Sequence, residues 1–337
     1  MNTLHLFRSS FCIYFLSILF ISCQQEQDTI SISPKMSSEL LSVGSHIVTL
    51  KSQIENKEQQ IISDLGVCWS SSPNPTISDH TANNGIYEED YVYTVIESPE
   101  IQPNSTYYIR AYLITGENVI YGNEIAFTST ETVTDVDGNV YPTVKIGEQL
   151  WMMENLKTTK LNDGTPIESL NYNSEWRKAD IAFSWYNYNK AYGILYGALY
   201  NGKAIQSNKL APEGWHVPTT DEWNILIEQL GGEQMASKYL KSHRDVAYDT
   251  DISPTHNYNL NSSGFSARMG GSSAPRLGTF KEVKQAGYWW ASDMTITKED
   301  KLLHYFWMLN GNSVVFQSGA SENSSSMVYF SVRCVKN

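Results

Sequence analysis

Short segments of alternating apolar and polar residues fill the first part of the chain and predict β-strands. A repeat of two places one face of a strand in a core and the other in solvent. The four clearest segments are Val48–Ile54, Leu65–Trp69, Tyr91–Ile96 and Tyr107–Ile114. Serine, proline, asparagine and glycine separate them, as turns require. Segments with this spacing and no helical periodicity predict a β-sandwich over residues 33–130.

A helical spacing appears in the second part of the chain. One apolar helix face is formed by positions i, i+3, i+4 and i+7: Trp223, Leu226, Ile227 and Leu230. Thr219 and Glu222 have the spacing of a capping box, and Gly231 follows the last apolar position. We therefore expect a helix between Thr219 and Gly231, followed by a second short helix near residues 235–240. Upstream, Asp137-Gly138 between β-forming residues predicts a tight turn rather than a calcium loop.

The N-terminus has the pattern of a secretory signal. Arg8 is the one charged residue before an apolar run over residues 11–22. Twelve helical residues span about 18 Å, which is short of the roughly 30 Å hydrocarbon core of a membrane. A cleaved signal peptide at residues 1–22 is therefore favoured over a membrane span.

Cys23 follows Phe20-Ile21-Ser22, and this order resembles the lipobox of bacterial lipoproteins, in a loose form associated with Bacteroidota. The resemblance implies a lipid on Cys23, a polar tether over residues 23–32, and an outer-membrane protein that faces the cell exterior. The alternative is an ordinary signal peptide with a cysteine by chance.

Composition limits the partners of the chain. With 24 Lys+Arg against 36 Asp+Glu, the 337 residues carry a formal net charge of −12. This acidic balance argues against binding to nucleic acid or electrostatic docking on anionic lipid. Beyond Cys12 and Cys23, only Cys68 and Cys334 remain, one in each expected domain. They provide neither a disulfide framework nor a zinc site, so we expect both to be small buried side chains. No cofactor is implied.

The stretch Ile101-Gln102-Pro103 followed by Tyr107 resembles the fibronectin type III pattern, which implies a tyrosine corner at Tyr107. Gly66-Val67-Cys68-Trp69 resembles a fibronectin-like repeat of Bacteroidota surface proteins, with Cys68 and Trp69 in the core. Such modules act as spacers. The acidic residues at 88–90 could bind calcium, but a solvated loop is favoured.

Residues 134–337 contain a series of motifs in a fixed order. These are Val144–Leu156, Tyr196–Asn201, Ala211–Trp223, Gly264–Ala267, Gly287–Ser292 and Ser331–Lys336. Together they resemble the Fibrobacter succinogenes major paralogous domain, a family with no settled biochemical function. The family often has Cys-Pro where this chain has Ala211-Pro212. If that cysteine normally pairs with the terminal one, Cys334 has lost its partner here.

The Gly214–Trp223 element is also similar to one in formylglycine-generating-enzyme-like domains, which have the C-type-lectin-like fold. The expected fold class is thus mainly β with α+β: a fibronectin type III-like sandwich, then a C-type-lectin-like domain at 134–337. His216 and Glu222 could act as acid or base, but a structural hydrogen bond and a helix cap are favoured. We expect no catalytic residues.

Eight of the nine tryptophans lie in the second domain. Trp151, Trp215, Trp223 and Trp289 fall inside the motifs, so we expect them in the core. Aromatic and amide side chains in polar stretches could instead form a sugar-binding platform, against the alternative of loop packing: Trp176, Trp185, Tyr186, Asn187, Asn257 and Tyr258. Asp249 and Asp251 could bind calcium, although a solvated loop is favoured.

Three functions fit these observations. The first is a cell-surface lipoprotein whose fibronectin-like stalk presents a lectin-like binding or adhesion domain to a glycan. The second is a structural component of a surface assembly that binds a protein partner. The least favoured is an enzyme related to the formylglycine-generating group, because that chemistry needs paired redox cysteines or copper and the domain has Cys334 alone.

Overall fold

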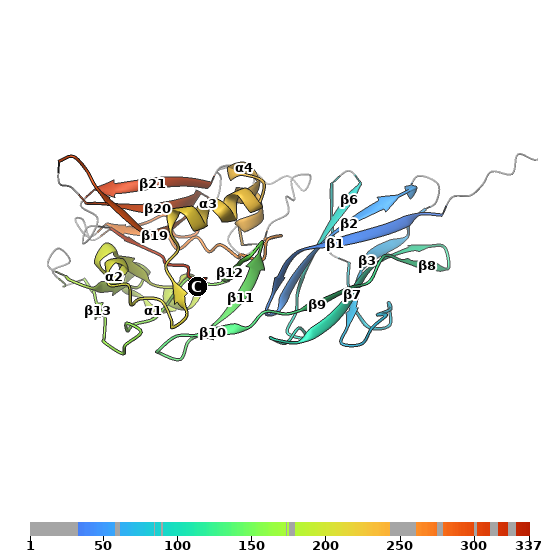
Figure 1. The fold of residues 1–337 in the computed structure, drawn as a ribbon, viewed down its shortest axis with the longest axis horizontal. Helices are drawn as coiled ribbons and strands as arrows, with labels where there is room; N and C mark the ends of the chain where they lie inside the picture. The colour runs from blue at the N-terminus through green and yellow to red at the C-terminus, as the bar shows by residue number, and fades with distance from the viewer. Residues whose placement is uncertain are drawn as a thin grey trace, which may run out of the picture. The chain divides into compact units, whose positions relative to one another are not determined.

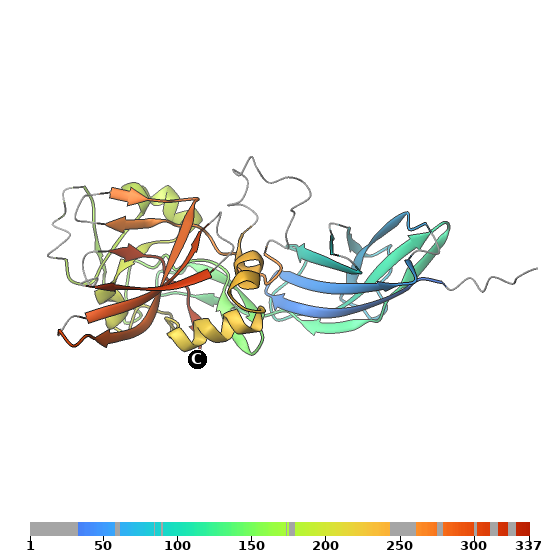
Figure 2. The same cartoon turned by 90° about the horizontal axis from the view of Figure 1, so that it is seen from above.

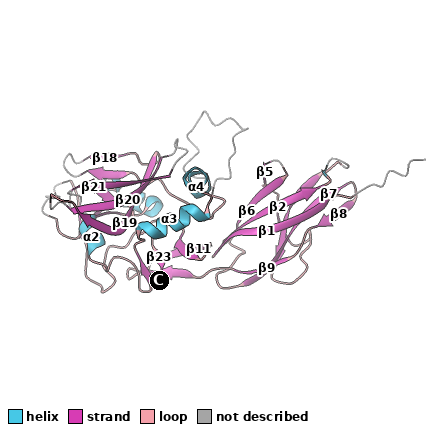
Figure 3. Ribbon diagram, turned by 45° about the horizontal axis from the view of Figure 1, so that its top comes forward, coloured by secondary structure: helices cyan, strands magenta, loops and turns pink. Residues whose placement is uncertain are grey.

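The computed structural model describes residues 33–57, 61–83, 85–88, 90–172, 174, 179–242, 261–274, 279–299, 302–310, 316–322 and 328–337. The protein is mainly β, and its described helices all lie between residues 186 and 240 (Figure 3). Cys23, Trp176, Asp249, Asp251, Asn257 and Tyr258 lie outside the described residues.

Residues 35–128 form two sheets that enclose one core. One sheet holds β1 (Lys35–Gly44), β2 (Ile47–Glu55), β6 (Tyr91–Glu97) and β5 (Ile86–Glu88), in that order. The other holds β4 (His80–Ala82), β3 (Asp64–Ser70), β7 (Thr106–Thr115) and β8 (Asn118–Tyr121), with β9 (Ile125–Thr128) on β7. Side chains from both sheets form one core cluster, and Figure 1 shows the two sheets as two layers. The four strands expected from alternation are confirmed.

The residues expected in this core are there. Cys68 is fully buried and Trp69 is 5 % exposed. Burial raises the pKa of the Cys68 thiol to about 11, so the thiol is protonated at neutral pH. The Tyr107 hydroxyl donates to the Glu100 carbonyl at 2.8 Å and accepts from the Gln102 N–H at 2.9 Å. This is the upstream backbone contact expected of that tyrosine.

The second part begins with strands that extend the first sheet. β10 (Thr132–Thr134) and β11 (Val140–Ile146) form a hairpin, and β12 (Gln149–Met152) pairs with β11. The last strand, β23 (Val335–Lys336), pairs with β12 and with β16 (Trp215–His216). β1 pairs with β11: Val43 lies opposite Lys145, and Gly44 lies opposite Val144. One sheet therefore runs through both parts. The segment that joins the two parts is hydrogen-bonded to both: the Ser129 hydroxyl donates to the Ser105 carbonyl, and the Thr130 hydroxyl donates to the Thr143 carbonyl.

Two further sheets complete the second part. A six-stranded sheet contains β13 (Glu168–Ser169), β14 (Ala182–Ser184), β15 (Leu199–Asn201), β22 (Tyr329–Phe330), β17 (Ser272–Ala274) and β18 (Thr279–Lys281). A three-stranded sheet contains β19 (Ala286–Ile296), β20 (Leu302–Asn310) and β21 (Phe316–Glu322). These strands lie side by side in Figure 1 and are coloured orange to red in Figures 1 and 2. These long strands were not expected from the sequence.

The helices are short: η2 (Tyr186–Tyr188), α1 (Lys190–Tyr196), α2 (Gly202–Gln206), α3 (Thr220–Gln229) and α4 (Glu233–Leu240). The predicted boundaries of α3 are confirmed. Thr219 and Glu222 form the capping box, and Gly231, with φ +85°, ends the helix. The N–H groups of Gly231 and Gly232 donate to the carbonyls of Glu228 and Ile227, which completes a Schellman motif.

Candidate functional site

The tryptophans of the family-like motifs form a core. Trp151, Trp223 and Trp289 are fully buried and Trp215 is 8 % exposed, which confirms the expectation for all four. The ring centroids of Trp151 and Trp223 are 4.9 Å apart. Cys334 is also fully buried, free, and in one cluster with Ala211. These buried residues stabilise the core and do not form a surface site.

Arg333 lies at the centre of this core, and no carboxylate of the described residues bonds to its guanidinium. Its Nε and Nη2 donate to Asn155 Oδ1 at 3.2 and 2.7 Å, and its other bonds go to the carbonyls of Met152, Phe265 and Ser266. Asn155 Oδ1 also accepts from Trp289 Nε1 at 2.8 Å. Burial lowers the pKa of Arg333 to about 9, so the side chain remains charged at pH 7.

His216 and Glu222 form a pair that bridges β16 and α3. His216 Nε2 lies 2.8 Å from Glu222 Oε1, and His216 Nδ1 lies 2.7 Å from Asn337 Oδ1. The Glu222 carboxylate also accepts from the Thr219 N–H and hydroxyl. The bond to Glu222 raises the pKa of His216. Burial alone would raise the pKa of Glu222, but the bonds from His216 and Thr219 lower it. Both side chains therefore have structural partners, as expected for a strand-to-helix junction.

The His216–Glu222 pair gives a testable pH dependence. The pKa of His216 is higher in the folded protein than in the unfolded chain, where it is about 6.5. The pair therefore contributes fully to the unfolding free energy below that unfolded pKa, and the contribution is lost as the pH rises through the folded pKa. Solvent screening keeps the effect to about 1 kcal/mol or less. Glu222→Gln retains the capping box and removes the charge, so its unfolding free energy should change less with pH between about 6 and 8. Chemical denaturation across this pH range measures the unfolding free energy of both proteins. If it changed equally with pH in wild type and Glu222→Gln, the raised pKa of His216 would not be due to Glu222.

The turn between β10 and β11 is built around two carboxylates. Asp135 accepts from the N–H groups of Asp137 and Asn139, and from the side chains of Asn139 and Tyr141. Asp137 accepts from the Thr159 N–H and hydroxyl and pairs with Lys160 at 3.1 Å. Burial opposes the shift, but these bonds from Thr159 and Lys160 lower the pKa of Asp137. Asp135 thus closes the hairpin on itself, and Asp137 anchors it to residues 158–160.

This turn and the segment 157–162 separate two surface hollows. Even-numbered residues Thr158, Lys160 and Asn162 line one, and odd-numbered residues Lys157 and Thr159 line the other. Such alternation is what an extended backbone produces. One segment therefore supplies a wall to both hollows.

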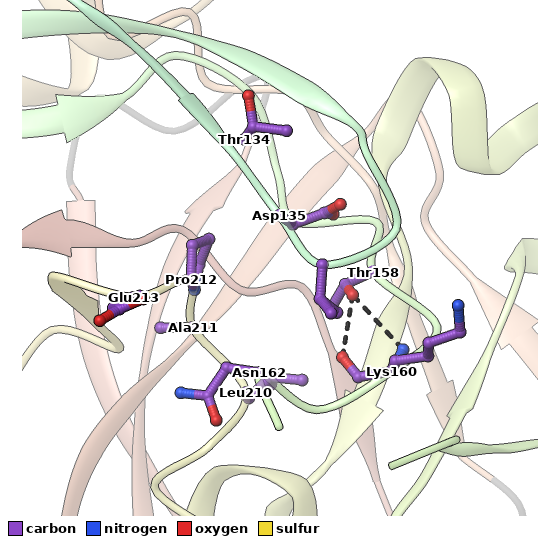
Figure 4. A pocket seen from close by; sticks show the side chains of 10 residues that line it. Thr134, Asp135, Thr158, Lys160, Asn162, Leu210, Ala211, Pro212 and Glu213 are labelled. Atoms are coloured by element: carbon purple, nitrogen blue, oxygen red, sulfur yellow. Dashed lines mark hydrogen bonds between the residues drawn. The ribbon is translucent and has the colours of Figure 1, made fainter. Parts of the chain in front are cut away.

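The first hollow, which we call the Asp135 hollow, measures about 230 Å³. It is lined by Thr134, Asp135, Val136, Thr158, Lys160, Asn162, Leu210, Ala211, Pro212 and Glu213 (Figure 4). The Thr158 hydroxyl donates to the Lys160 carbonyl at 2.9 Å, and the Asp135 carboxylate is occupied by the turn. Because no aromatic ring lines it, this hollow is the weaker candidate for a ligand with an apolar face.

The second hollow, the Trp185 cleft, measures about 400 Å³. It is lined by Asp137, Asn139, Lys157, Thr159, Trp185, Lys190, Gly193 and Ile194. The Trp185 ring is partly buried and meets Phe183 edge to face at 5.1 Å. An aromatic ring among amide, hydroxyl and ammonium groups suits a polar ligand that also has an apolar face.

The neighbouring candidates from the sequence do not share this cleft. Tyr186 packs against Tyr192 and Phe280, with centroid distances of 5.3 and 5.1 Å, beside a different core cluster. Asn187 is exposed, with φ +52°. Trp185 is thus the one described residue of the proposed platform that lines the cleft. Asn139, Lys157, Thr159 and Lys190 were missed, and Asp137 was interpreted only as a turn residue, because nothing local in the sequence places these segments together.

Gly193 sets the position of the Trp185 ring. A Cβ at residue 193 would lie 2.2 Å from Trp185 Cε3. Glycine inside a helix costs about 1 kcal/mol relative to alanine, so Gly193→Ala would ordinarily stabilise α1. We expect instead no gain in unfolding free energy, together with a changed tryptophan near-UV circular dichroism spectrum. Asn224→Ala, at an exposed position of α3, is the control and should gain a few tenths of a kcal/mol. A Gly193→Ala protein with an unchanged spectrum and higher stability would contradict the packing.

The described ranges hold no group of three or more His, Cys, Asp or Glu side chains placed to bind one metal ion. Within those same ranges, no helix is both long and apolar enough to cross a lipid bilayer.

The fold and the cleft define a mainly β protein whose second part packs short helices and small sheets around buried tryptophans. Residues 144–336 match the family model of the Fibrobacter succinogenes major domain. Since the match covers more than half of the 337 residues, the protein belongs to this family. The resemblance found in its motifs is confirmed for that domain. A search of curated proteins found no match.

Proposed function

We propose that this protein is a cell-surface lipoprotein that binds carbohydrate chains in the Trp185 cleft and has no catalytic role. The observation that carries the proposal is the cleft itself: one indole ring held in place by Phe183 and Gly193 and faced by hydrogen-bonding groups. Sugars have apolar faces edged with hydroxyl groups, so a ring beside amide and hydroxyl side chains matches both properties.

The first part supports a role as a spacer. Its two facing sheets, with strand orders β1-β2-β6-β5 and β4-β3-β7-β8, and the Tyr107 contact agree with a fibronectin type III-like sandwich. In the second part, the terminal strand β23 pairs with β12 and β16, which agrees with the closing strand of a C-type-lectin-like domain. With a lipid on Cys23, the sandwich would hold the cleft away from the outer membrane.

A glycan array tests the binding proposal. The full chain, purified in detergent, is screened with calcium and with chelator. Trp185→Ala should weaken binding at least tenfold, or about 1.4 kcal/mol. Tyr172→Ala removes an aromatic ring that is 81 % exposed and does not line the cleft, so it should bind normally. Equal losses in both variants, or no binding by folded wild-type protein, would contradict the proposal.

Lipid attachment is tested separately. Wild-type protein should take up radiolabelled palmitate in cells and fractionate with the outer membrane, whereas Cys23→Ala should not. Equal labelling of both proteins would contradict the lipid anchor and leave the binding proposal standing.

A protein partner is the second candidate function. Two adjacent apolar side chains of α1, Ile194 and Leu195, are 70 % and 56 % exposed. Pull-down from a native envelope should then recover a partner that Leu195→Ser releases, since Leu195 does not line the cleft. Binding to glycans without any such partner would reject this candidate.

A further inference from the structure

Three charged side chains line the Trp185 cleft, and among the described residues two of them have an ion-pair partner. Asp137 is neutralised by Lys160 at 3.1 Å, and Lys157 by Glu154 at 3.0 Å. Lys190 opens α1, whose first turn has no acidic residue. Throughout the described residues, Lys190 has neither an ion pair nor a hydrogen bond to another side chain. One positive charge in the cleft is therefore unmatched, in a chain whose formal net charge is −12.

The remaining hydrogen-bonding capacity of the cleft favours an anion. An ammonium has three N–H donors, so Lys190 offers three and Lys157 retains two after its bond to Glu154. The acceptor that could compete for a cation, the Asp137 carboxylate, already accepts from Thr159 and contacts Lys160. An incoming ligand would thus meet mainly donors.

We propose that the cleft selects acidic carbohydrate, a chain containing uronic-acid residues, whose carboxylate binds Lys190 while a sugar ring lies against Trp185. This inference rests on the proposed function and specifies its ligand class. The polar side chains Asn139 and Thr159 in the same cleft can serve sugar hydroxyl groups, which a peptide carboxylate or a free phosphate would leave unused.

The net charge of the chain restricts how anionic the ligand can be. Screening confines the attraction of Lys190 to about 8 Å at physiological ionic strength. A densely charged polyanion would meet the excess of acidic residues beyond that range. A single uronic-acid residue among neutral sugars, held close to Lys190, avoids this repulsion.

The test compares oligosaccharides that differ by the carboxylate alone. Oligosaccharides of equal length and linkage that carry either one glucuronic-acid or one glucose residue at the same position, and the matching galacturonic-acid and galactose pair, are titrated against the full chain in detergent. We expect at least one acidic oligomer to bind about fivefold more tightly than its neutral partner, the upper range for an exposed ion pair of about 1 kcal/mol. Sodium chloride at about 0.5 M should remove the preference.

Two lysine variants locate the effect. Lys190→Gln should reduce the acidic-to-neutral affinity ratio to about one. Lys203→Gln, which removes an equal charge paired with Asp180 outside the cleft, should leave the ratio unchanged. Equal affinity for acidic and neutral oligomers, an equal change in both variants, or equally tight binding of polyglutamate would overturn the inference. Absence of binding to all oligosaccharides by folded protein would instead reject the carbohydrate proposal.

Discussion

Replacing Arg333 with methionine should lower the unfolding free energy by about 3–5 kcal/mol, because several buried acceptors would lose the donors that now satisfy them. All five N–H donors of Arg333 are used, and methionine would leave three backbone carbonyls without their donor. An unmade hydrogen bond at a buried group costs about 1–3 kcal/mol. Urea unfolding followed by circular dichroism measures the loss.

Two further variants separate charge from geometry. Arg333→Lys would keep the charge but present its donors from a single nitrogen, so about half of the loss should remain. Lys336→Met removes a partly exposed cation three residues away that pairs with Glu131, and should cost about 1 kcal/mol or less. If Arg333→Met behaved like Lys336→Met, the buried network would not stabilise the fold.

Replacing Trp223 with alanine should cost about 3–5 kcal/mol, as expected for a large aromatic side chain removed from a core. Trp223 is fully buried, and its ring centroid lies within 4.9–6.5 Å of four other rings: Trp151, Phe265, Trp307 and Trp289. A cavity among aromatic rings cannot close without moving several of them. Thermal and urea unfolding both report this loss.

Trp185→Ala provides the matched comparison. The Trp185 ring is partly buried at the edge of its core cluster, so we expect a loss of about 1–2 kcal/mol, together with the loss of ligand binding. We thus expect Trp223 to determine stability and Trp185 to determine ligand recognition. Equal destabilisation by the two substitutions would show that Trp185 is a core residue and would weaken the binding proposal.

The sequence predicted those strands and helices whose signal lies within a single segment of the chain. Alternation located four strands of the sandwich, and the spacing of Trp223, Leu226 and Ile227 with the Thr219 cap located α3, because both signals lie within one element. The pairing of β1 with β11 joins residues about a hundred positions apart, and no local signal specifies it. The long strands β19 to β21 were not predicted either, since their register depends on partner strands.

The candidate site was predictable only in part. Trp185 could be selected as an aromatic residue in a polar stretch. Asp137, Lys157 and Lys190 lie on a turn, an extended segment and a helix, and only the folded chain brings them to one cleft. His216 and Glu222 were each interpreted as structural residues, but their mutual bond depends on how residues 217–219 turn from strand to helix.

The pairing of β1 with β11 has a consequence for any attempt to isolate the second part. A fragment without residues 33–130 would lose Ile47 from the core cluster that includes Val144 and Trp151, and would lose the Ser45 N–H that donates to the Thr143 carbonyl. The open side of β11 around Val144 would then be an uncovered sheet edge, which is a template for pairing with another chain. In this protein, β1 of the first part therefore covers an edge of the family domain that would otherwise be open.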